Sequence, residues 1–267
     1  NSSFIAIKVI NDQYKNDPDL LKALHNEARK TQSLAHPNII TVYDFDRDHD
    51  TVFMTMEFID GVPLDHIIKS NPNGMPIKKA LHIVSKMGQA LIYAHSQHLV
   101  HSDFKPNNVL INSSNQVKVF DFGIARLTNK SISRSFDPGV LAGLTPSYAS
   151  LEMLNGETPD PRDDLYALAC ITYELLSGHH PFNKKSADVA RKNNLKANKI
   201  EGLNSNQWNA LKQALAFNRS DRTEDISLFL QQFLADKKKP PYVLAALFSL
   251  SIVIIILAYS HFKTEDV

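Results

Sequence analysis

The sequence predicts an α+β fold of two lobes, a small sheet-rich lobe and a larger helical lobe, followed by one transmembrane helix. Three observations support this fold class. Short apolar alternations typical of strands dominate residues 1–60, whereas long amphipathic patterns typical of helices dominate residues 61–235. The third observation is a stretch without any charged side chain, from Pro240 to Ser260. The chain therefore divides into two lobes and an apolar C-terminal segment.

The first lobe is predicted to contain three strands and one helix. Residues 4–10 read as one strand, and residues 39–45 and 51–58 read as a pair. The helix should begin at Asp17-Pro18, because aspartate caps helices and proline suits their first turn. It should end before Pro37, so this lobe is a sheet accompanied by a single helix.

The second lobe begins after Gly61 and is predicted to be mainly helical. Long helices are expected at 76–98 and 162–177, and the second should end at Gly178, a typical glycine stop. Two shorter amphipathic helices are expected at 206–217 and 224–234. Between the long helices we expect a hairpin with apolar runs at 109–111 and 117–120, and then an irregular polar stretch at 124–150.

Bulk composition narrows the class of protein. A hydrophobic content of 43% and a charged content of 21% indicate a folded globular chain and exclude a disordered one. The net charge of +1 gives no reason to expect a nucleic-acid partner. The single cysteine, Cys170, excludes an internal disulfide and fits a reducing compartment. Its apolar helical surroundings predict a buried, inert thiol.

The C-terminal segment is predicted to cross a membrane. Residues 241–260 are long enough, because about 20 residues of helix span the roughly 30 Å hydrocarbon core. A basic linker, residues 236–240, precedes them, and a short tail, residues 261–267, follows. The positive-inside rule keeps the lobes in the cytoplasm and sends the tail across the inner membrane. A buried core helix is the alternative, although such helices are usually shorter and carry a polar face.

Two short motifs concentrate polar groups suited to phosphoryl transfer. One is His101-Ser102-Asp103-Phe104-Lys105-Pro106-Asn107-Asn108, and the other is Asp121-Phe122-Gly123. The first places a carboxylate, an ammonium and a carboxamide on one loop, and the hairpin delivers a second carboxylate beside it. Transfer from a magnesium nucleotide needs one group to orient a hydroxyl, one to steady the phosphoryl group and two oxygen ligands for the metal.

With these motifs the chain resembles the eukaryotic-like protein kinases, and within them the Ser/Thr branch found in bacteria, from about residue 5 to about residue 234. The resemblance implies the two-lobed protein kinase fold. It also implies transfer of the γ-phosphoryl group of ATP, with Mg²⁺, to Ser or Thr hydroxyls of protein substrates. The chain's own Ser and Thr hydroxyls are further candidate acceptors. Together with residues 241–260 as the contact with the lipid bilayer, it predicts a single-pass, membrane-anchored signalling kinase.

The resemblance implies a role for each polar group of the two motifs. Asp103 is expected to be the catalytic base, or the residue that orients the substrate hydroxyl. Lys105 would neutralise charge on the transferred phosphoryl group. Asn108 and Asp121 would hold Mg²⁺, a hard cation that prefers oxygen ligands.

Further residues are expected to bind the nucleotide. Lys8, on the first strand, would hold the α and β phosphates, and Glu27 would fix its rotamer. Met56 would guard the back of the adenine pocket, and Glu57 and Phe58 begin the hinge whose backbone would bind adenine. Alone, a strand lysine is usually a solvated surface group, and the later motifs reverse that interpretation.

Other positions are expected to support the site. The run 142–148 would form a floor for a peptide substrate, with Thr145 bonding toward Asp103 and Lys105. Glu152 should pair with Arg222 in a buried bridge, and Asp164 should brace the catalytic loop through its backbone amides. These roles also come from the resemblance.

The chain departs from the family pattern in two places. All nine glycines lie at position 61 or later, so the glycine-rich phosphate loop expected before Lys8 is not in this sequence. We therefore expect a fragment truncated at its N-terminus that binds nucleotide weakly. Ser102 stands where the family usually has an arginine that reads a phosphate on the activation segment, so activity should not require that phosphate.

Two other functions compete with an active protein kinase. One is a catalytically silent kinase-like scaffold at the membrane, although none of the expected lysine, asparagine or aspartate groups is missing. The other is a kinase of small molecules with the same fold, which the peptide floor at 142–148 disfavours. A transition-metal enzyme is not expected, because the eleven histidines show no ligand spacing with cysteine or acid support.

Overall fold

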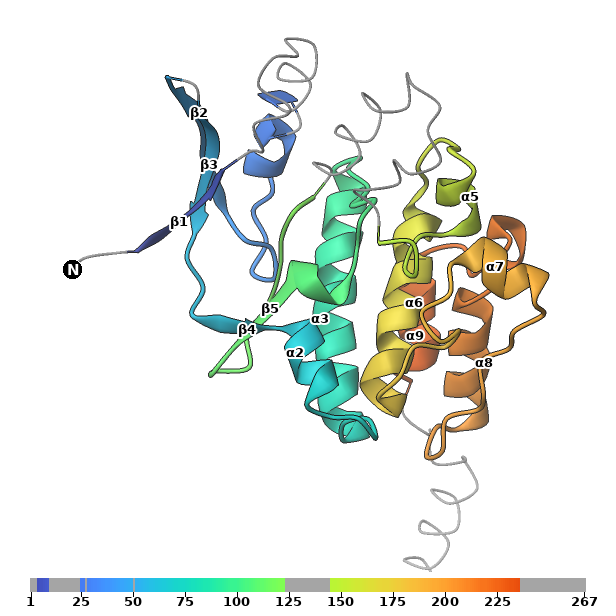
Figure 1. Ribbon diagram of the computed structural model, residues 1–267. Helices are drawn as coiled ribbons and strands as arrows, with labels where there is room; N and C mark the ends of the chain where they lie inside the picture. Colours follow the sequence, from blue (N-terminus) through green and yellow to red (C-terminus); the bar gives the residue numbers. More distant parts are fainter. Residues whose placement is uncertain (1–3, 10–24, 27, 50, 123–144, 236–267) are drawn as a thin grey trace, which may run out of the picture. The chain divides into compact units, whose positions relative to one another are not determined.

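A computed structural model describes residues 4–9, 25–26, 28–49, 51–122 and 145–235, which form two small sheets and a group of packed helices (Figure 1). All the described helices and strands belong to one unit, Asn1–Leu234. The predicted α+β class, with a sheet-rich first lobe and a helical second lobe, is confirmed.

The first sheet is antiparallel and has the order β1-β3-β2, formed by β1 (Ile5–Val9), β2 (Val42–Asp48) and β3 (Thr51–Glu57). Alternate residues of β3 are buried, including Met54 and Met56, and they form a small apolar core with Ile40 and Ala28. Lys8 pairs in register with Met54, so its side chain leaves β1 on the face of this core. Residues 28–32 are helical and pack on the same face through Ala28.

The second sheet joins the hinge region to the predicted hairpin. It contains β4 (Gly61–Pro63), β5 (Val109–Asn112) and β6 (Val117–Val119), in that antiparallel order. A segment before β2 forms a short parallel bridge with β6, in which Ile40 donates to Val119 O at 2.9 Å and Val119 N donates to Asn38 O at 2.8 Å. The Asn38 carboxamide adds a bond to Val117 O at 2.9 Å. The first lobe is thereby tied to the strand that leads to Asp121.

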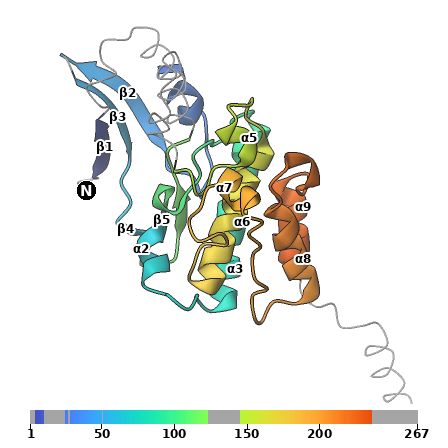
Figure 2. The ribbon, with the colours of Figure 1, turned by 45° about the vertical axis from the view of Figure 1, so that its right-hand side comes forward.

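Two long helices form the centre of the second lobe. Figures 1 and 2 place α3 (Ile77–Ser96) and α6 (Pro161–Ser177) side by side, and α8 (Ser205–Ala214) and α9 (Ile226–Phe233) pack on them. Nearly all of α6 is buried, including Cys170, which confirms the predicted burial of its thiol. Burial raises the pKa of that thiol well above its usual range.

The ends of α6 follow local rules of helix capping. Asp160 and Asp163 form a reciprocal capping box at its start, and Pro161 occupies the first position. At its end Gly178 adopts a left-handed conformation with φ of 80°, and an added Cβ would lie 2.1 Å from Pro72 O. The predicted glycine stop is confirmed, and close approach of another backbone segment adds a second reason for glycine.

The predicted helices and strands are found within a few residues of their expected bounds, except for the helix start at Asp17-Pro18, which lies outside the described residues. Among the described residues, six short elements were missed: β4, α2 (Leu64–Lys69), α5 (Leu151–Leu154), α7 (Ala187–Lys192) and two 3₁₀ helices, Pro106–Asn108 and Arg219–Asp221. Each spans six residues or fewer, too short to show a helical or strand period.

Among the described residues, no helix is both long and apolar enough to cross a membrane. The predicted spanning segment 241–260, its basic linker 236–240 and the tail 261–267 lie outside those residues. Membrane insertion therefore stays a prediction from the sequence.

Candidate active site

The first motif forms a loop between α3 and β5 whose backbone is hydrogen-bonded to a buried carboxylate of α6. Asp164, in the first turn of α6, accepts the backbone N–H groups of His101 and Ser102 at 2.8 and 2.9 Å. Its Oδ2 also lies 2.7 Å from His95 Nε2. Burial alone would raise the pKa of Asp164, but the bonds from His95 and His101 outweigh it and hold the pKa below its ordinary value. The predicted bracing role of Asp164 is confirmed.

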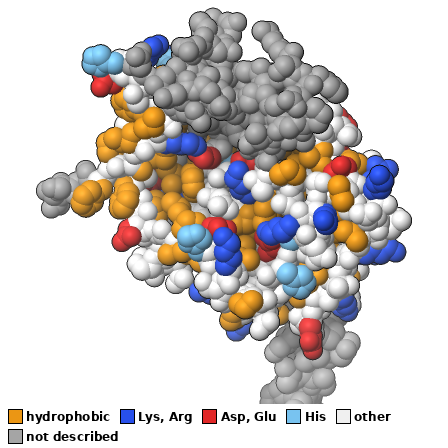
Figure 3. Space-filling model, viewed as in Figure 1, with side chains coloured by type: hydrophobic (Ala, Val, Ile, Leu, Met, Phe, Trp, Pro, Cys, Tyr) orange, Lys and Arg blue, Asp and Glu red, His pale blue; other side chains and the backbone are white. Residues whose placement is uncertain are grey.

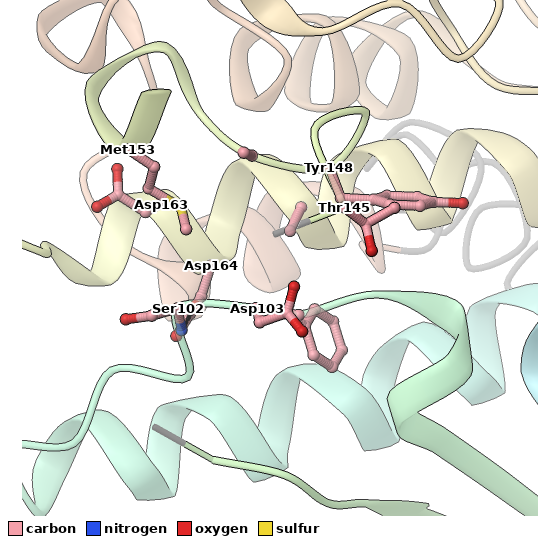
Figure 4. A pocket seen from close by; sticks show the side chains of 10 residues that line it. Ser102, Asp103, Thr145, Tyr148, Met153, Asp163 and Asp164 are labelled. Atoms are coloured by element: carbon pink, nitrogen blue, oxygen red, sulfur yellow. Dashed lines mark hydrogen bonds between the residues drawn. The ribbon is translucent and has the colours of Figure 1, made fainter. Parts of the chain in front are cut away.

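The chain turns sharply at Ser102. This residue is buried and has a φ of 64°, in the left-handed region that non-glycine residues seldom adopt. The turn lets two successive amides point at one carboxylate, and the next residue, Asp103, lines a recess (Figure 4). The unusual backbone of Ser102 therefore serves the placement of Asp103.

Asp103, Lys105 and Asn108 come together as predicted. Lys105 Nζ lies 2.6 Å from Asp103 Oδ2, and both side chains are largely buried. The Asn108 Nδ2 group donates to Asp103 O at 2.9 Å, from a 3₁₀ turn, Pro106–Asn108, that also buries the asparagine. The carboxylate and the ammonium thus face the same small volume.

Residues of the predicted peptide floor also line the recess beside Asp103. Its lining includes Thr145, Tyr148 and Met153, and Figure 4 shows the side chains of Asp103 and Thr145 pointing toward one another across it. Residues 142–144 of the predicted floor lie outside the described residues. A hydroxyl-bearing segment placed against Thr145 would therefore meet Asp103.

The second motif brings Asp121 to the lysine of the first sheet. Lys8 Nζ lies 2.6 Å from Asp121 Oδ1, so the two predicted nucleotide-binding groups are in direct contact. Asp121 itself has a φ of 67°, so this predicted site residue also adopts a left-handed backbone conformation. Glu27, the predicted partner of Lys8, lies outside the described residues, as does Gly123.

His101 connects the two motifs. Its Nε2 lies 2.9 Å from Phe120 O, so this nitrogen carries the proton, and its ring packs 4.6 Å from the Phe122 ring. A backbone bond from Phe120 N to Asn108 O at 3.1 Å joins the same two segments. His101 is thus a packed, hydrogen-bonded loop residue that ties the segment before Asp121 to the loop of Asp103.

An apolar recess lies behind Asp121. It is lined by the first sheet and by the second motif, namely Thr31, Ile40, Val42, Met54, Met56, Phe120, Asp121 and Phe122. Met56 is buried and lines this recess, and its role at the back of an adenine pocket stays a prediction. Phe58, two residues on, is about half exposed, in keeping with a hinge that acts through its backbone.

Lys118 is a buried residue of the site that sequence reasoning missed. Its ammonium lies 2.8 Å from Glu57 Oε2 and 3.3 Å from Ile39 O. Glu57 Oε2 also accepts Thr41 N at 3.1 Å, so the start of the hinge is fastened to β6. The one available signal was a lysine between two valines of a predicted buried strand, where a charge needs a partner.

The donor set fits magnesium held together with a polyphosphate. Asn108 uses its Nδ2 group on Asp103 O, which leaves its Oδ1 as the ligand oxygen, and Asp121 supplies a carboxylate. Within the described part of the chain, no group of three or more His, Cys, Asp or Glu side chains could hold a metal ion. A carboxylate with a carboxamide suits Mg²⁺, which takes its remaining ligands from phosphates and water.

The lower lobe contains the predicted buried bridge. Arg222 Nη2 lies 2.9 Å from Glu152 Oε2, and the arginine side chain is fully buried. Arg222 also donates to three backbone carbonyls, those of Ala216, Phe217 and Arg162. Burial opposes ionisation of Glu152, but bonds from Arg222 outweigh it and lower the pKa of Glu152. The predicted pair is confirmed.

A second polar cluster under the floor was not predicted. The Tyr148 hydroxyl donates to Glu174 Oε2 at 2.7 Å, and the Lys184 ammonium contacts both groups. Burial and then the charge of Glu174 raise the pKa of Tyr148, so its hydroxyl stays protonated and acts as a donor. His180 joins this cluster to the floor, with Nε2 2.9 Å from Ser147 O.

His180 makes the stability of the fold depend on pH. Burial, and then the charge of Lys184, lower the pKa of His180 to about 4 from its ordinary 6.5. As the pH falls, His180 therefore takes up a proton in the unfolded chain at a higher pH than in the folded chain. The contribution of neutral His180 to the stability of the fold is complete above about pH 6.5 and is lost as the pH falls toward 4. At about 1.4 kcal/mol per pKa unit, we expect on the order of 3 kcal/mol less stability across this window.

Urea unfolding at pH 7 and pH 4.5 measures this effect. His180→Asn should be less stable at pH 7 and should show a shallower decline toward pH 4.5 than the natural chain. His179→Asn is the matched control, because His179 is the exposed neighbour. An unchanged pH slope in His180→Asn would show that this imidazole is not the titrating group.

The chain was then compared with known proteins. Residues 1–240 match the protein kinase domain family. Serine/threonine-protein kinase PrkC of Bacillus subtilis is 34% identical over 77% of this chain and 31% of its own length. Serine/threonine-protein kinase PknB of Mycobacterium tuberculosis is 32% identical over 82% of this chain and 36% of its own length. The chain thus spans about a third of these relatives.

A solved structure agrees with the sequence comparison. The crystal structure of the Mycobacterium tuberculosis PknI kinase domain has a TM-score of 0.68 and 26% identity, and covers 86% of this chain and 84% of that domain. Two lobes, the joined motifs and these matches lead to one conclusion. The chain belongs to the protein kinase domain family, and its relatives include bacterial serine/threonine-protein kinases.

Proposed function

We propose that this chain transfers the γ-phosphoryl group of ATP to Ser or Thr hydroxyls of protein substrates. The contact of Lys105 with Asp103, which lines the same recess as Thr145, carries the proposal. Lys8 and Asp121 meet at the other motif, and His101 ties the two motifs together. The relatives named above are serine/threonine-protein kinases, which supports the same choice of acceptor.

Each residue of the site would have its own role in phosphoryl transfer. The Asp103 carboxylate would accept a hydrogen bond from the substrate hydroxyl and orient its oxygen toward the γ-phosphorus. The Lys105 ammonium, next to it, would balance negative charge on the transferred group. Lys8 would bind the phosphates that leave, and Asn108 and Asp121 would hold Mg²⁺. The bound ion would neutralise charge on the phosphates.

A transfer assay tests the proposal. The full-length protein, incubated with γ-labelled ATP and a protein rich in exposed Ser and Thr, should label that protein or itself when Mg²⁺ is present. Chelation of the metal should stop the labelling. Phosphoamino-acid analysis should find phosphoserine or phosphothreonine. Absence of labelling with and without Mg²⁺ would favour the silent scaffold instead.

We also propose that the chain is held in the cytoplasmic membrane by residues 241–260, with both lobes in the cytoplasm. The support is the uncharged stretch and the three lysines at 237–239 that precede it. The chain should stay with membranes after alkaline extraction, and protease added outside spheroplasts should leave the lobes intact. Release into the soluble fraction would contradict the proposal.

Position 102 leads to an expectation about regulation. Ser102 is buried with its N–H on Asp164, so the position presents no cationic side chain to a phosphate on the segment after Asp121. Phosphatase-treated protein should therefore keep most of its initial rate, measured before any new phosphate accumulates. A fall to the rate without enzyme would show that an activating phosphate is needed and that another group binds it.

A further inference from the structure

A strongly basic segment begins just after α6. From position 184 to position 199 the sequence has six basic residues and one acidic residue, Asp188, a net charge of +5. The whole chain carries +1, so all other residues together carry −4 (1 − 5 = −4). All six basic side chains are exposed: Lys184, Lys185, Arg191, Lys192, Lys196 and Lys199. Positive charge is therefore concentrated on one part of the second lobe.

Five of these side chains form what we call the α7 basic surface: Lys185, Arg191, Lys192, Lys196 and Lys199. Among the described residues, none of the five has a carboxylate within ion-pair distance, whereas Lys184 pairs with Glu174. Figure 3 shows Lys and Arg side chains gathered over the part of this face where Figure 1 places α7. The charge of the surface is thus available to a partner.

The start of the surface is fastened to the floor beside Asp103. Lys184 and the residue before it, Asn183, both have positive φ, 60° and 52°. The N–H groups of Phe182 and Lys184 donate to His180 Nδ1 at 3.1 and 3.2 Å, while the opposite nitrogen of that ring lies 2.9 Å from Ser147 O. The imidazole therefore bridges the basic segment and the floor.

The side chain of Lys184 makes a second connection. Its ammonium contacts the Tyr148 hydroxyl and lies 4.7 Å from the centre of the Tyr148 ring. Tyr148 lines the recess that contains Asp103 and Thr145. Lys184, the neighbour of the first residue of the α7 basic surface, thus contacts the recess where a substrate hydroxyl would meet Asp103.

We propose that the α7 basic surface selects protein substrates whose acceptor Ser or Thr is flanked by an acidic segment. This inference rests on the proposed function and names its substrate class. Clustered exposed cations attract anionic chains and speed their encounter with the site, an effect that salt screens over about 8 Å at physiological ionic strength. Five cations beside the floor would act on such a segment while its hydroxyl lies at Asp103.

An acidic peptide fits this surface better than a lipid headgroup does. Protein segments that lie on a membrane combine cations with exposed large apolar side chains. Within the described residues, the exposed large hydrophobic side chains all lie between positions 4 and 62, in the first lobe and β4. Near α7, Val189 and Leu195 are partly buried. Charge is therefore the one means of attraction that this surface offers.

Two peptides with the same acceptor core test the inference, one flanked by Asp and Glu and one by Gln. With full-length chain at low salt, kcat/KM should be on the order of tenfold higher for the acidic peptide, mainly through KM. The difference should shrink at higher salt. Lys192→Glu combined with Lys196→Glu should abolish the preference and leave the rate with the Gln-flanked peptide unchanged.

The matched control reverses two exposed lysines elsewhere, Lys78→Glu with Lys79→Glu in the first turn of α3, and should keep the preference. Equal kcat/KM for the two peptides, with clear transfer to both, would overturn the inference and leave the proposed function standing. Transfer to neither would overturn the proposed function.

Binding provides a readout that does not depend on transfer. Fluorescence anisotropy with the Asp103→Asn chain should show tighter binding of the acidic peptide, lost in the Lys192→Glu, Lys196→Glu background. A background that keeps this binding but no longer binds vesicles of anionic phospholipid would assign the surface to a membrane and overturn the inference.

Discussion

Asp103→Asn should lower phosphoryl transfer by about 10²- to 10⁴-fold while the protein stays folded, since this is the usual contribution of a positioned general base. Asparagine has the same shape, so the bond from Asn108 to the backbone of residue 103 can persist. It has no negative charge to pair with Lys105, which lies 2.6 Å away in the natural chain, and it cannot accept a proton. The loss should therefore be one of rate.

Initial rates at saturating ATP measure this effect, and circular dichroism with urea unfolding checks the fold. Glu201→Gln is the matched control, an exposed carboxylate exchanged for a carboxamide, and should leave the rate unchanged. If Asp103→Asn transferred phosphate as fast as the natural chain, Asp103 could not be the group that orients the acceptor.

Arg222→Met should destabilise the fold by about 3–5 kcal/mol, the usual cost of removing one partner of a buried ion pair. The variant leaves Glu152 charged in a buried site and deprives three backbone carbonyls of their donor. For a domain of this size, each kcal/mol lowers Tm by roughly 2–4 °C. A fall in Tm on the order of 10 °C is therefore expected.

Denaturant unfolding with matched m values gives the free energy directly. Arg191→Met, on the exposed face of α7, is the control and should change stability by no more than about 0.5 kcal/mol. Adding Glu152→Leu to Arg222→Met should recover part of the loss, because the unpaired charge is then gone. A single variant no less stable than the control would show that the bridge contributes nothing net.

The parts of the site carried by local motifs could be predicted from the sequence. Asp103, Lys105 and Asn108 lie within six positions of one another, so the loop that contains them brings them together whatever surrounds it. The long helices were predictable for different reasons: α3 shows its buried face as a helical period, whereas α6 is a long apolar run that ends at a glycine stop. Asp164 and Glu152 were predictable only through the resemblance, which supplied their distant partners.

The contacts that were missed depend on tertiary packing. Lys118 and Glu57 are 61 positions apart, and His180 meets Ser147 across 33. Nothing local in the sequence pairs these residues, because each finds its partner on a segment far away in the sequence. The partner of Lys8 was missed for the same reason, since Lys8 lies on β1 and Asp121 follows β6, which belongs to the other sheet.

The way in which Asp164 holds the loop has an evolutionary consequence. Asp164 accepts hydrogen bonds from main-chain N–H groups, which every amino acid except proline possesses. The identity of residue 102 is thereby uncoupled from the position of Asp103, provided that the left-handed turn is tolerated. During evolution, a phosphate-binding side chain could be gained or lost at position 102 without moving Asp103. Regulation by phosphorylation and the rate of phosphoryl transfer can therefore change independently.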